Sequence, residues 1–334
     1  MPIPDDSFKI AAVQAAPVYL DRDATVDKAC GLIAEAGRNG ARIVVFPESF
    51  VPAYPDWVWA VPPGAEAVLN ELYAELLANA VEIPSAATQR LCQAAKRAKT
   101  HVVMGMTERN TEASGASLYN TLLYIDAQGN ILGKHRKLVP TGGERLVWAQ
   151  GDGSTLQVYD TPFGKLGGLI CWENYMPLAR YAMYAWGTQI YVAATWDRGE
   201  PWLSTLRHIA KEGRAYVVGC CIVERVDDIP EQFQFREFFR AVGREWVNVG
   251  DSAIVNPDGE FIAGPLHEEE GILYAEVDPA QMRGPKWMLD VAGHYARPDV
   301  FELIVHTNAR PIIASDAGTP GSNEDTSKKT TRRK

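Results

Sequence analysis

The chain has 334 residues, of which 46% are hydrophobic and 22% charged, and its net charge is -9 at pH 7 with a pI near 5.3. This composition is typical of a globular protein with a large core, and the absence of a basic stripe before the last few residues argues against a nucleic-acid partner. No apolar run approaches the roughly 18 to 20 residues that cross a bilayer. Residues 1–9 also lack the blocks of a secretion signal. We therefore expect a cytoplasmic protein with no nucleic-acid or membrane partner.

Apolar runs typical of β-strands alternate along the chain with helical patterns. In chain order, the β-type runs cover residues 9–14, 42–46, 101–107, 118–125, 166–171, 189–194, 216–223, 252–256 and 272–277. The helical patterns cover residues 23–38, 65–79, 86–98, 177–185, 201–214 and 279–288. This alternation predicts an α/β fold. A hairpin turn over residues 126–130, with Gly129 as its left-handed residue, predicts that the sheets are mixed.

No linker or change of composition divides the chain before residue 310, so we expect a single large domain over residues 1–310. Residues 311–334 are rich in polar side chains with almost nothing apolar to bury, a composition typical of a disordered tail. The acidic and aromatic stretch 227–246 is interpreted either as an oligomer contact or as a surface excursion.

Cys171 lies where the apolar run 164–170 meets a polar exit, Trp172, Glu173 and Asn174. A thiol at the carboxyl end of a buried strand, just before a helix, lies where open α/β sheets carry their chemistry and where a helix dipole favours a thiolate. We interpret Cys171 as a catalytic nucleophile; the alternative is a buried core residue, the usual place of free cysteine. Core positions are expected for the other four cysteines, Cys30, Cys92, Cys220 and Cys221.

The chain has five cysteines, and this odd number and their spacing argue against a disulfide framework or a zinc site, so we expect no metal.

Glu48 directly follows a strongly apolar strand, and Pro47 would end the ladder there. A loop rich in aromatic residues and proline comes next, with Tyr54, Trp57 and Trp59. This loop is interpreted as the wall of a small apolar pocket, or else as a packed surface loop or a partner contact. An acid beside such a wall would be desolvated, which raises its pKa and suits proton transfer near neutrality. Glu48 is therefore our candidate general base, with a solvated acid or a helix cap as the alternative.

Lys137 is the last of four basic or titratable residues and precedes Leu138, Val139 and Pro140, which should draw its stem inward. A buried ammonium needs an anionic partner, and Glu48 or Glu144 could supply it. The cation could then stabilise negative charge that develops on a substrate. We expect Lys134 and Arg136 to be solvated, and His135 has no setting that marks it as a base.

Three separated motifs together resemble the nitrilase superfamily, and specifically its true nitrilase branch. They are Phe46-Pro47-Glu48, the stretch from Lys134 to Pro140 with Gly143-Glu144-Arg145, and Cys171-Trp172-Glu173-Asn174. The resemblance implies a four-layer αββα sandwich with mixed sheets, a catalytic set of Glu48, Lys137 and Cys171, and a second acid at Glu144. It implies no metal or organic cofactor, and it implies a homo-oligomer built from dimers that could extend into spiral filaments.

The function implied is hydrolysis of an organic nitrile to a carboxylic acid and ammonia through a covalent intermediate on the cysteine. The alternatives are an amidase or N-carbamoyl hydrolase of the same superfamily, a cyanide hydratase or amide-forming nitrilase, and a noncatalytic filament-forming relative. We expect the substrate pocket to include Tyr54, Trp57, Trp172, Glu173, Asn174 and Trp196. Its aromatic residues favour an arylaliphatic nitrile, although each of them could instead belong to the core.

Overall fold

The computed structural model describes residues 6–310, which form two β-sheets flanked by helices. The strands of the first sheet are β13 (Gly271–Val277), β1 (Phe8–Gln14), β2 (Ala41–Val45), β3 (His101–Arg109), β4 (Leu118–Ile125) and β5 (Ile131–Arg136), in that spatial order. The second sheet runs β10 (Val223–Arg225), β11 (Trp246–Val255), β9 (Tyr216–Cys221), β8 (Ile190–Thr195), β7 (Gly164–Ile170) and β6 (Tyr159–Thr161), with β12 (Phe261–His267) paired to β11. Both sheets contain parallel and antiparallel pairs, which confirms that they are mixed.

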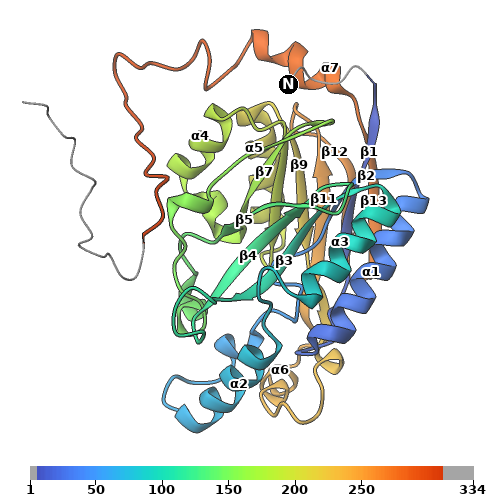
Figure 1. Cartoon of the computed structure of the whole chain (residues 1–334), viewed down its shortest axis with the longest axis vertical. Coiled ribbons are helices and arrows are strands. Elements are labelled where there is room, and N and C mark those ends of the chain that lie inside the picture. Colours follow the sequence, from blue (N-terminus) through green and yellow to red (C-terminus); the bar gives the residue numbers. More distant parts are fainter. Residues whose placement is uncertain (1–5, 311–334) are drawn as a thin grey trace, which may run out of the picture.

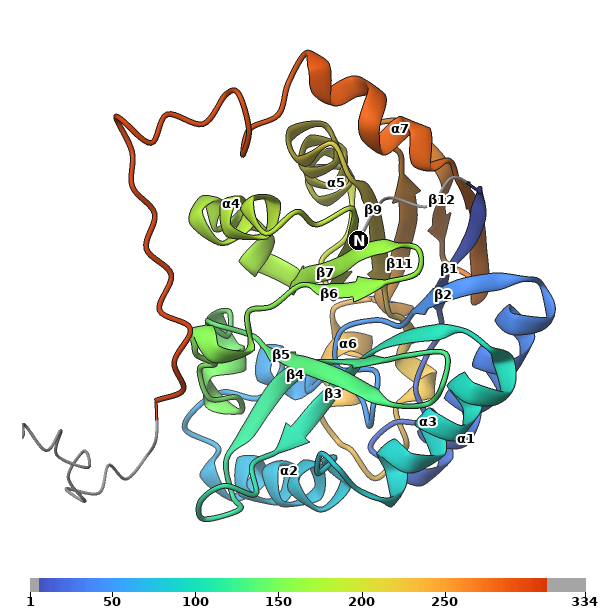
Figure 2. The ribbon, with the colours of Figure 1, turned by 45° about the horizontal axis from the view of Figure 1, so that its top comes forward.

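The helices complete a four-layer αββα sandwich. They are α1 (Arg22–Arg38), α2 (Glu66–Asn79), α3 (Ala86–Ala98), α4 (Pro177–Ala185), α5 (Glu200–Gly213), α6 (Arg236–Ala241) and α7 (Pro279–Arg283). Helices α1 and α3 cover the outer face of the first sheet, and α4 and α5 cover the second (Figures 1 and 2). The α/β prediction and the sandwich are both confirmed.

The layers follow from the alternation of side chains along each strand. On β2, Val44 packs with α1 and α3 on the outer face, whereas Ile43 and Val45 point inward and meet Val192 and Val218 of the second sheet. Because both faces of the strand are buried, its sequence is an unbroken apolar run. The inner core therefore brings the ends of β2 and β7, which belong to different sheets, close together.

Most predicted elements are present, with bounds that differ by a few residues. The hairpin turn is confirmed, since the Asp126 N–H donates to Asn130 O at 2.9 Å and Gly129 has a φ of 82°. The helix expected over 279–288 ends at Arg283 and continues as a 3-10 turn. Strand β12 was not predicted, because Gly264 and Pro265 interrupt its apolar pattern.

Beyond α7 the chain runs as an irregular segment along the outside of the molecule, past α4 (Figure 2). It rejoins the body near Asp152, whose Oδ2 accepts from the Arg310 N–H at 2.8 Å. The predicted polar tail, residues 311–334, lies outside the described residues, so a domain boundary at residue 310 stays a prediction.

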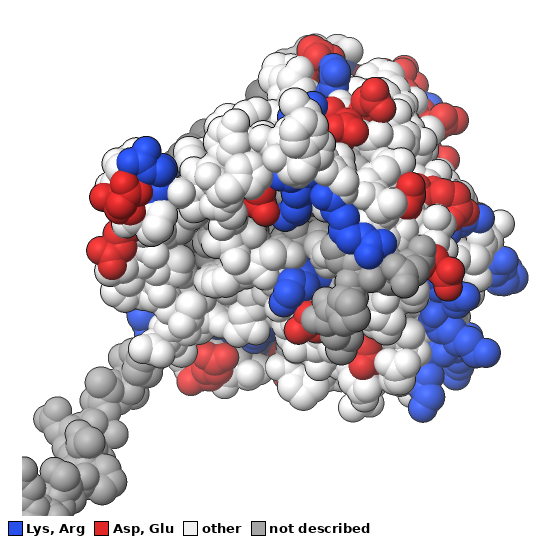
Figure 3. Space-filling view, turned by 90° about the horizontal axis from the view of Figure 1, so that it is seen from above, with Lys and Arg blue, Asp and Glu red and all other residues white. Residues whose placement is uncertain are grey.

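Within residues 6–310, no helix combines the length and apolarity needed to cross a bilayer. On the face seen in Figure 3, basic side chains lie among acidic and uncharged ones.

Candidate active site

Four predicted residues meet between the two sheets. Glu48 follows β2, Lys137 directly follows β5, Glu144 lies on the 3-10 turn Gly142–Leu146, and Cys171 begins the turn Cys171–Tyr175 after β7. A carboxylate oxygen of each acid and the Cys171 sulfur all lie within 4.8 Å of one another. The site forms because the ends of strands from both sheets converge there.

The Lys137 ammonium lies between the two carboxylates. Its Nζ donates to Glu48 Oε1 at 2.8 Å and to Glu144 Oε2 at 2.7 Å, and all three side chains are buried. Burial by itself would lower the pKa of Lys137, but the negative charges of Glu48 and Glu144 raise it above its ordinary value. Lys137 is therefore a fixed cation and cannot act as the resting base. These acids and the thiol are residue types that also bind metals, but here Lys137 supplies the positive charge.

Glu48 keeps one carboxylate oxygen free. Its Oε1 accepts from Lys137 and, at 2.7 Å, from Asn120 Nδ2, whereas Oε2 is buried with no hydrogen-bond partner among the described residues. Burial raises the pKa of Glu48, Lys137 lowers it and Glu144 raises it, and the net shift is upward. A carboxylate with a raised pKa and a free oxygen can accept a proton from the thiol.

Glu144 has both oxygens occupied. Oε1 accepts from the Tyr54 hydroxyl at 2.8 Å, and Oε2 accepts from Lys137 and from the Thr141 N–H at 2.7 Å. This arrangement suits a residue that orients Lys137 rather than one that exchanges protons.

Cys171 occupies a strained turn at the end of β7. Its φ is 52°, in the left-handed region that residues other than glycine rarely adopt. Gly168 allows β7 to approach β8 closely, since a Cβ there would lie 2.0 Å from Val192 O. The sulfur is thereby held at the strand end, beside the acids.

The resting thiol is neutral, contrary to the expected helix-dipole effect. Burial raises the pKa of Cys171, the charge of Glu48 raises it further, and Lys137 and a hydrogen bond with Thr195 lower it only in part. The following turn is a 3-10 helix of five residues, too short for a substantial dipole. Formation of the thiolate therefore requires a base, and Glu48 has a carboxylate oxygen that is free to accept the proton.

A family model described as carbon-nitrogen hydrolase matches residues 9–285. The chain belongs to this family. It is 42% identical to an aliphatic nitrilase of Sinorhizobium fredii, over 93% of this chain and 99% of the relative. It is 40% identical to nitrilase 1 of Arabidopsis thaliana, over 93% and 90% of the two chains, and 42% identical to a bifunctional nitrilase/nitrile hydratase of Nicotiana tabacum, over 91% and 87%. Within the carbon-nitrogen hydrolases, these similarities assign the chain to the true nitrilase branch.

Solved carbon-nitrogen hydrolase structures share the fold. Nit3 of Saccharomyces cerevisiae superposes with a TM-score of 0.68 at 23% identity, covering 88% of this chain and 98% of that one. An amidase from Nesterenkonia gives a TM-score of 0.62 at 20% identity, with 86% and 97% covered.

Two residues expected in the substrate pocket of this carbon-nitrogen hydrolase have other partners. The Glu173 carboxylate accepts from the backbone N–H groups of Ile170 at 2.7 Å and Leu138 at 2.6 Å, and it contacts His135 Nε2 at 3.0 Å. It thus joins the residue before Cys171 to the residue after Lys137. The Asn174 amide donates to Cys171 O at 2.8 Å and to Leu169 O, and its oxygen accepts from the Tyr191 hydroxyl. Both side chains brace the turn that holds Cys171.

The aromatic candidates divide into three settings. Tyr54 and Trp196 stack at 5.1 Å with planes 19° apart, and Tyr54 reaches the site through Glu144. Trp57 is fully buried and packs edge-on against Phe235 at 6.2 Å. Trp172 is half exposed, and its indole N–H donates to Asp197 Oδ2 at 2.8 Å. Tyr54 therefore contacts an acid of the cluster directly, and Trp196 lies against Tyr54.

Sequence reasoning missed two polar contributors to the site, Asn120 on β4 and Thr195 at the end of β8. Each follows an apolar residue on a strand where the pattern places a buried side chain. A polar residue at such a core position is a usable signal, since buried polar groups are normally hydrogen-bonded.

Proposed function

We propose that this enzyme is a nitrilase that converts an organic nitrile into a carboxylic acid and ammonia, with Cys171 as nucleophile, Glu48 as general base and Lys137 as the stabilising cation. The observation that carries the proposal is the buried ammonium held between two carboxylates within reach of a strained cysteine. The sequence similarity to relatives named as nitrilases supports nitriles as the substrate class.

In the first half of the reaction, Glu48 takes the thiol proton while the sulfur bonds to the nitrile carbon. One bond of the carbon-nitrogen triple bond breaks, and Lys137 stabilises the negative charge that develops on nitrogen. The proton returns through Glu48 to this nitrogen, which leaves a neutral thioimidate. Desolvation strengthens the attraction between Lys137 and the nitrogen, because the site is buried.

In the second half, Glu48 activates a water molecule that adds to the thioimidate carbon. The tetrahedral intermediate gains a proton on nitrogen and expels ammonia, which leaves a thioester. A second water hydrolyses the thioester to the carboxylic acid and restores the thiol. If the tetrahedral intermediate expels the sulfur instead, the product is an amide, and the similarity to a relative named bifunctional nitrilase/nitrile hydratase favours amide as a side product.

We propose that the substituent on the nitrile lies against Tyr54 and Trp196, with a preference for arylaliphatic groups. The stacked pair is apolar on its faces and is tied to the catalytic acids through the Tyr54 hydroxyl. Glu173 and Asn174 would act on the pocket indirectly, through the Cys171 turn that they hold, and Trp57 and Trp172 would complete its wall.

A panel of nitriles and their amides, assayed for ammonia and for product identity, tests the activity. We expect acid and ammonia from at least one nitrile, no turnover by Cys171→Ala, and unchanged turnover by the control Cys92→Ala, whose side chain is half buried on α3. Turnover of amides alone would make the protein an amidase, and no turnover of either class would favour a noncatalytic relative. Activity retained in Cys171→Ala would refute the nucleophile.

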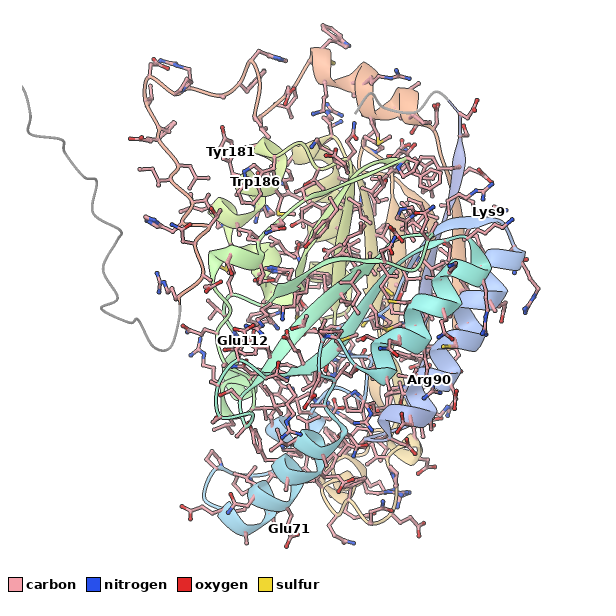
Figure 4. The ribbon with its side chains drawn as sticks, viewed as in Figure 1. Lys9, Glu71, Arg90, Glu112, Tyr181 and Trp186 are labelled. Atoms are coloured by element: carbon pink, nitrogen blue, oxygen red, sulfur yellow. The ribbon has the colours of Figure 1, made fainter. Side chains whose placement is uncertain are left out.

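We propose further that copies of this chain associate into dimers through α4 and the irregular segment that follows α7 and ends near Arg310. These dimers could extend into filaments. Large apolar side chains are exposed there, among them Leu178, Val300, Phe301 and Ile304. Leu178, Val300 and Phe301 border a hollow of about 1120 Å³, and Tyr181 and Trp186 lie on the side of α4 that faces the segment (Figure 4). Analytical ultracentrifugation of the full chain and of Phe301→Glu tests this, since the variant should dissociate. The cytoplasmic location stays a prediction that cell fractionation would check.

A further inference from the structure

Two buried acids lie outside the catalytic cluster. Asp56, on the 3-10 turn Asp56–Trp59, and Glu224, on β10, are both fully buried, and each carboxyl group shifts the pKa of the other. Neither residue takes part in the mechanism above. Buried carboxylates are expensive unless they are paired, so their presence calls for a physical explanation.

Only one of the four carboxyl oxygens in this acid pair has a hydrogen-bond donor among the described residues. Asp56 Oδ1 accepts from the Trp196 indole N–H at 2.9 Å. Asp56 Oδ2 and both Glu224 oxygens find no hydrogen-bond donor among the described residues. Two neighbouring buried carboxyl groups that lack other donors can satisfy each other only when one of them carries a proton, and such a pair titrates as a unit.

The surrounding groups keep that proton in place. Burial raises the pKa of Asp56 to about 7, although Trp196 and Arg198 act to lower it. Burial and the charges of Asp56 and Asp228 raise the pKa of Glu224 well above its usual range. Tyr19, which also interacts with Asp56 and Glu224, is itself held neutral by burial, which raises its pKa. A second negative charge would form in this pair only as the pH rises.

The acid pair is connected to the reacting groups through Trp196. The Trp196 ring stacks on Tyr54 and, at 6.1 Å, on Trp59. Tyr54 donates to Glu144, which holds Lys137, and Trp196 directly follows Thr195, which acts to lower the pKa of Cys171. A displacement of the indole would therefore alter the apolar wall beside the nucleophile.

We propose that Asp56 and Glu224 share one proton and act as positioning residues that hold Trp196 against Tyr54, and that this pair determines which nitrile substituents the enzyme accepts. The inference rests on the proposed nitrilase activity for its substrate. When the shared proton is lost at alkaline pH, two adjacent charges repel each other, and the anchor of the indole N–H is displaced. Bulky nitriles that need the wall should then lose turnover before small nitriles do.

The test compares kcat/KM for an arylaliphatic nitrile with kcat/KM for a small aliphatic nitrile across pH. The ratio cancels ionisations of Glu48, Lys137 and Cys171, because both substrates depend on them equally. In the wild type, we expect the ratio to fall about tenfold or more as pH rises, since a methylene-sized change in fit is worth about tenfold. Glu224→Gln should keep the neutral-pH ratio and lose its pH dependence, because an amide N–H replaces the shared proton.

Asp56→Leu removes the acceptor for Trp196, so the ratio should be low at every pH, mainly through KM. The control Glu245→Gln removes an exposed carboxylate that pairs with Arg225, next to Glu224, and should behave as the wild type. A flat wild-type ratio, or the same pH dependence in Glu224→Gln as in the wild type, would overturn the proposal.

Infrared difference spectroscopy provides a readout that does not need turnover. The wild type at neutral pH should show the carbonyl stretch of a protonated carboxyl group, and Glu224→Gln should lack it. Absence of that band in the wild type would overturn the shared proton even if nitriles are hydrolysed. The presence of the band without nitrile hydrolysis would instead refute the proposed function. Tryptophan fluorescence would then test the positioning of Trp196, since it should change in Asp56→Leu and not in Glu245→Gln.

Discussion

Replacement of Glu48 by Gln should make Cys171 more reactive and the enzyme inactive. The Gln side chain keeps an oxygen that can accept from Lys137 and Asn120, so the fold around it should survive. It removes a negative charge close to the sulfur and also removes the only oxygen of Glu48 that is free to accept a proton. Loss of the charge should raise the reactivity of the thiol, whereas loss of the free oxygen should lower turnover, so two assays can measure the two effects separately.

The size of the first effect follows from the distance. A carboxylate oxygen of Glu48 lies within 4.8 Å of the sulfur, and at an effective dielectric constant of about 20 the repulsion of a thiolate at that distance is about 3 kcal/mol. Its removal lowers the pKa of Cys171 and increases the thiolate fraction by about 100-fold. Because intrinsic nucleophilicity falls as the pKa falls, alkylation should become faster by about tenfold.

Alkylation of Cys171 by iodoacetamide near neutral pH, followed by mass spectrometry, measures this change. Cys30 is half buried on α1 and serves as an internal control whose rate should not change. Nitrile turnover by Glu48→Gln should fall at least about 100-fold, the usual contribution of a positioned base. Slower alkylation than in the wild type would refute the electrostatic reasoning, and turnover within a few fold of the wild type would refute Glu48 as the base.

Two further substitutions test how the site is held. Glu173→Gln should lower the free energy of unfolding in urea by about 3 kcal/mol at neutral pH, because a buried charge-assisted network is broken. Burial raises the pKa of Glu173, but contacts with His135 and two backbone N–H groups lower it by more, so the net shift is downward. The wild type should therefore lose this stability as pH falls below about 4.3. An equally steep acid dependence in the variant would contradict the assignment. Gly105→Ala should reduce turnover about 100-fold, since its Cβ would lie 1.9 Å from Pro47 O, next to Glu48. The control Gly31→Ala meets no atom within 4 Å and should stabilise α1 by about 0.5–1 kcal/mol with normal activity; equal turnover in both variants would refute the clash.

Local sequence patterns were sufficient to predict most of the helices and strands. The helices over 86–98 and 177–185 have the predicted bounds, because the Ser85 cap and Pro177 at the first helical position mark where they begin. Strand β12 and helix α6 were missed, since Gly264 and Pro265 interrupt the apolar pattern of the strand and α6 is only six residues long. Such short elements are stabilised by tertiary packing, which no local window contains.

The sequence by itself determined the family, the α/β alternation and the identity of Glu48, Lys137, Glu144 and Cys171 as candidates, because motifs and strand ends are local features. Only the tertiary structure decided that Lys137 bridges the two acids, that Glu173 braces the backbone, and that Asp56 meets Glu224 from 168 positions away in the chain. It also decided that the resting thiol is neutral, contrary to the dipole argument. Protonation depends on burial and on charges within a few ångströms, and these are set by which distant segments pack together.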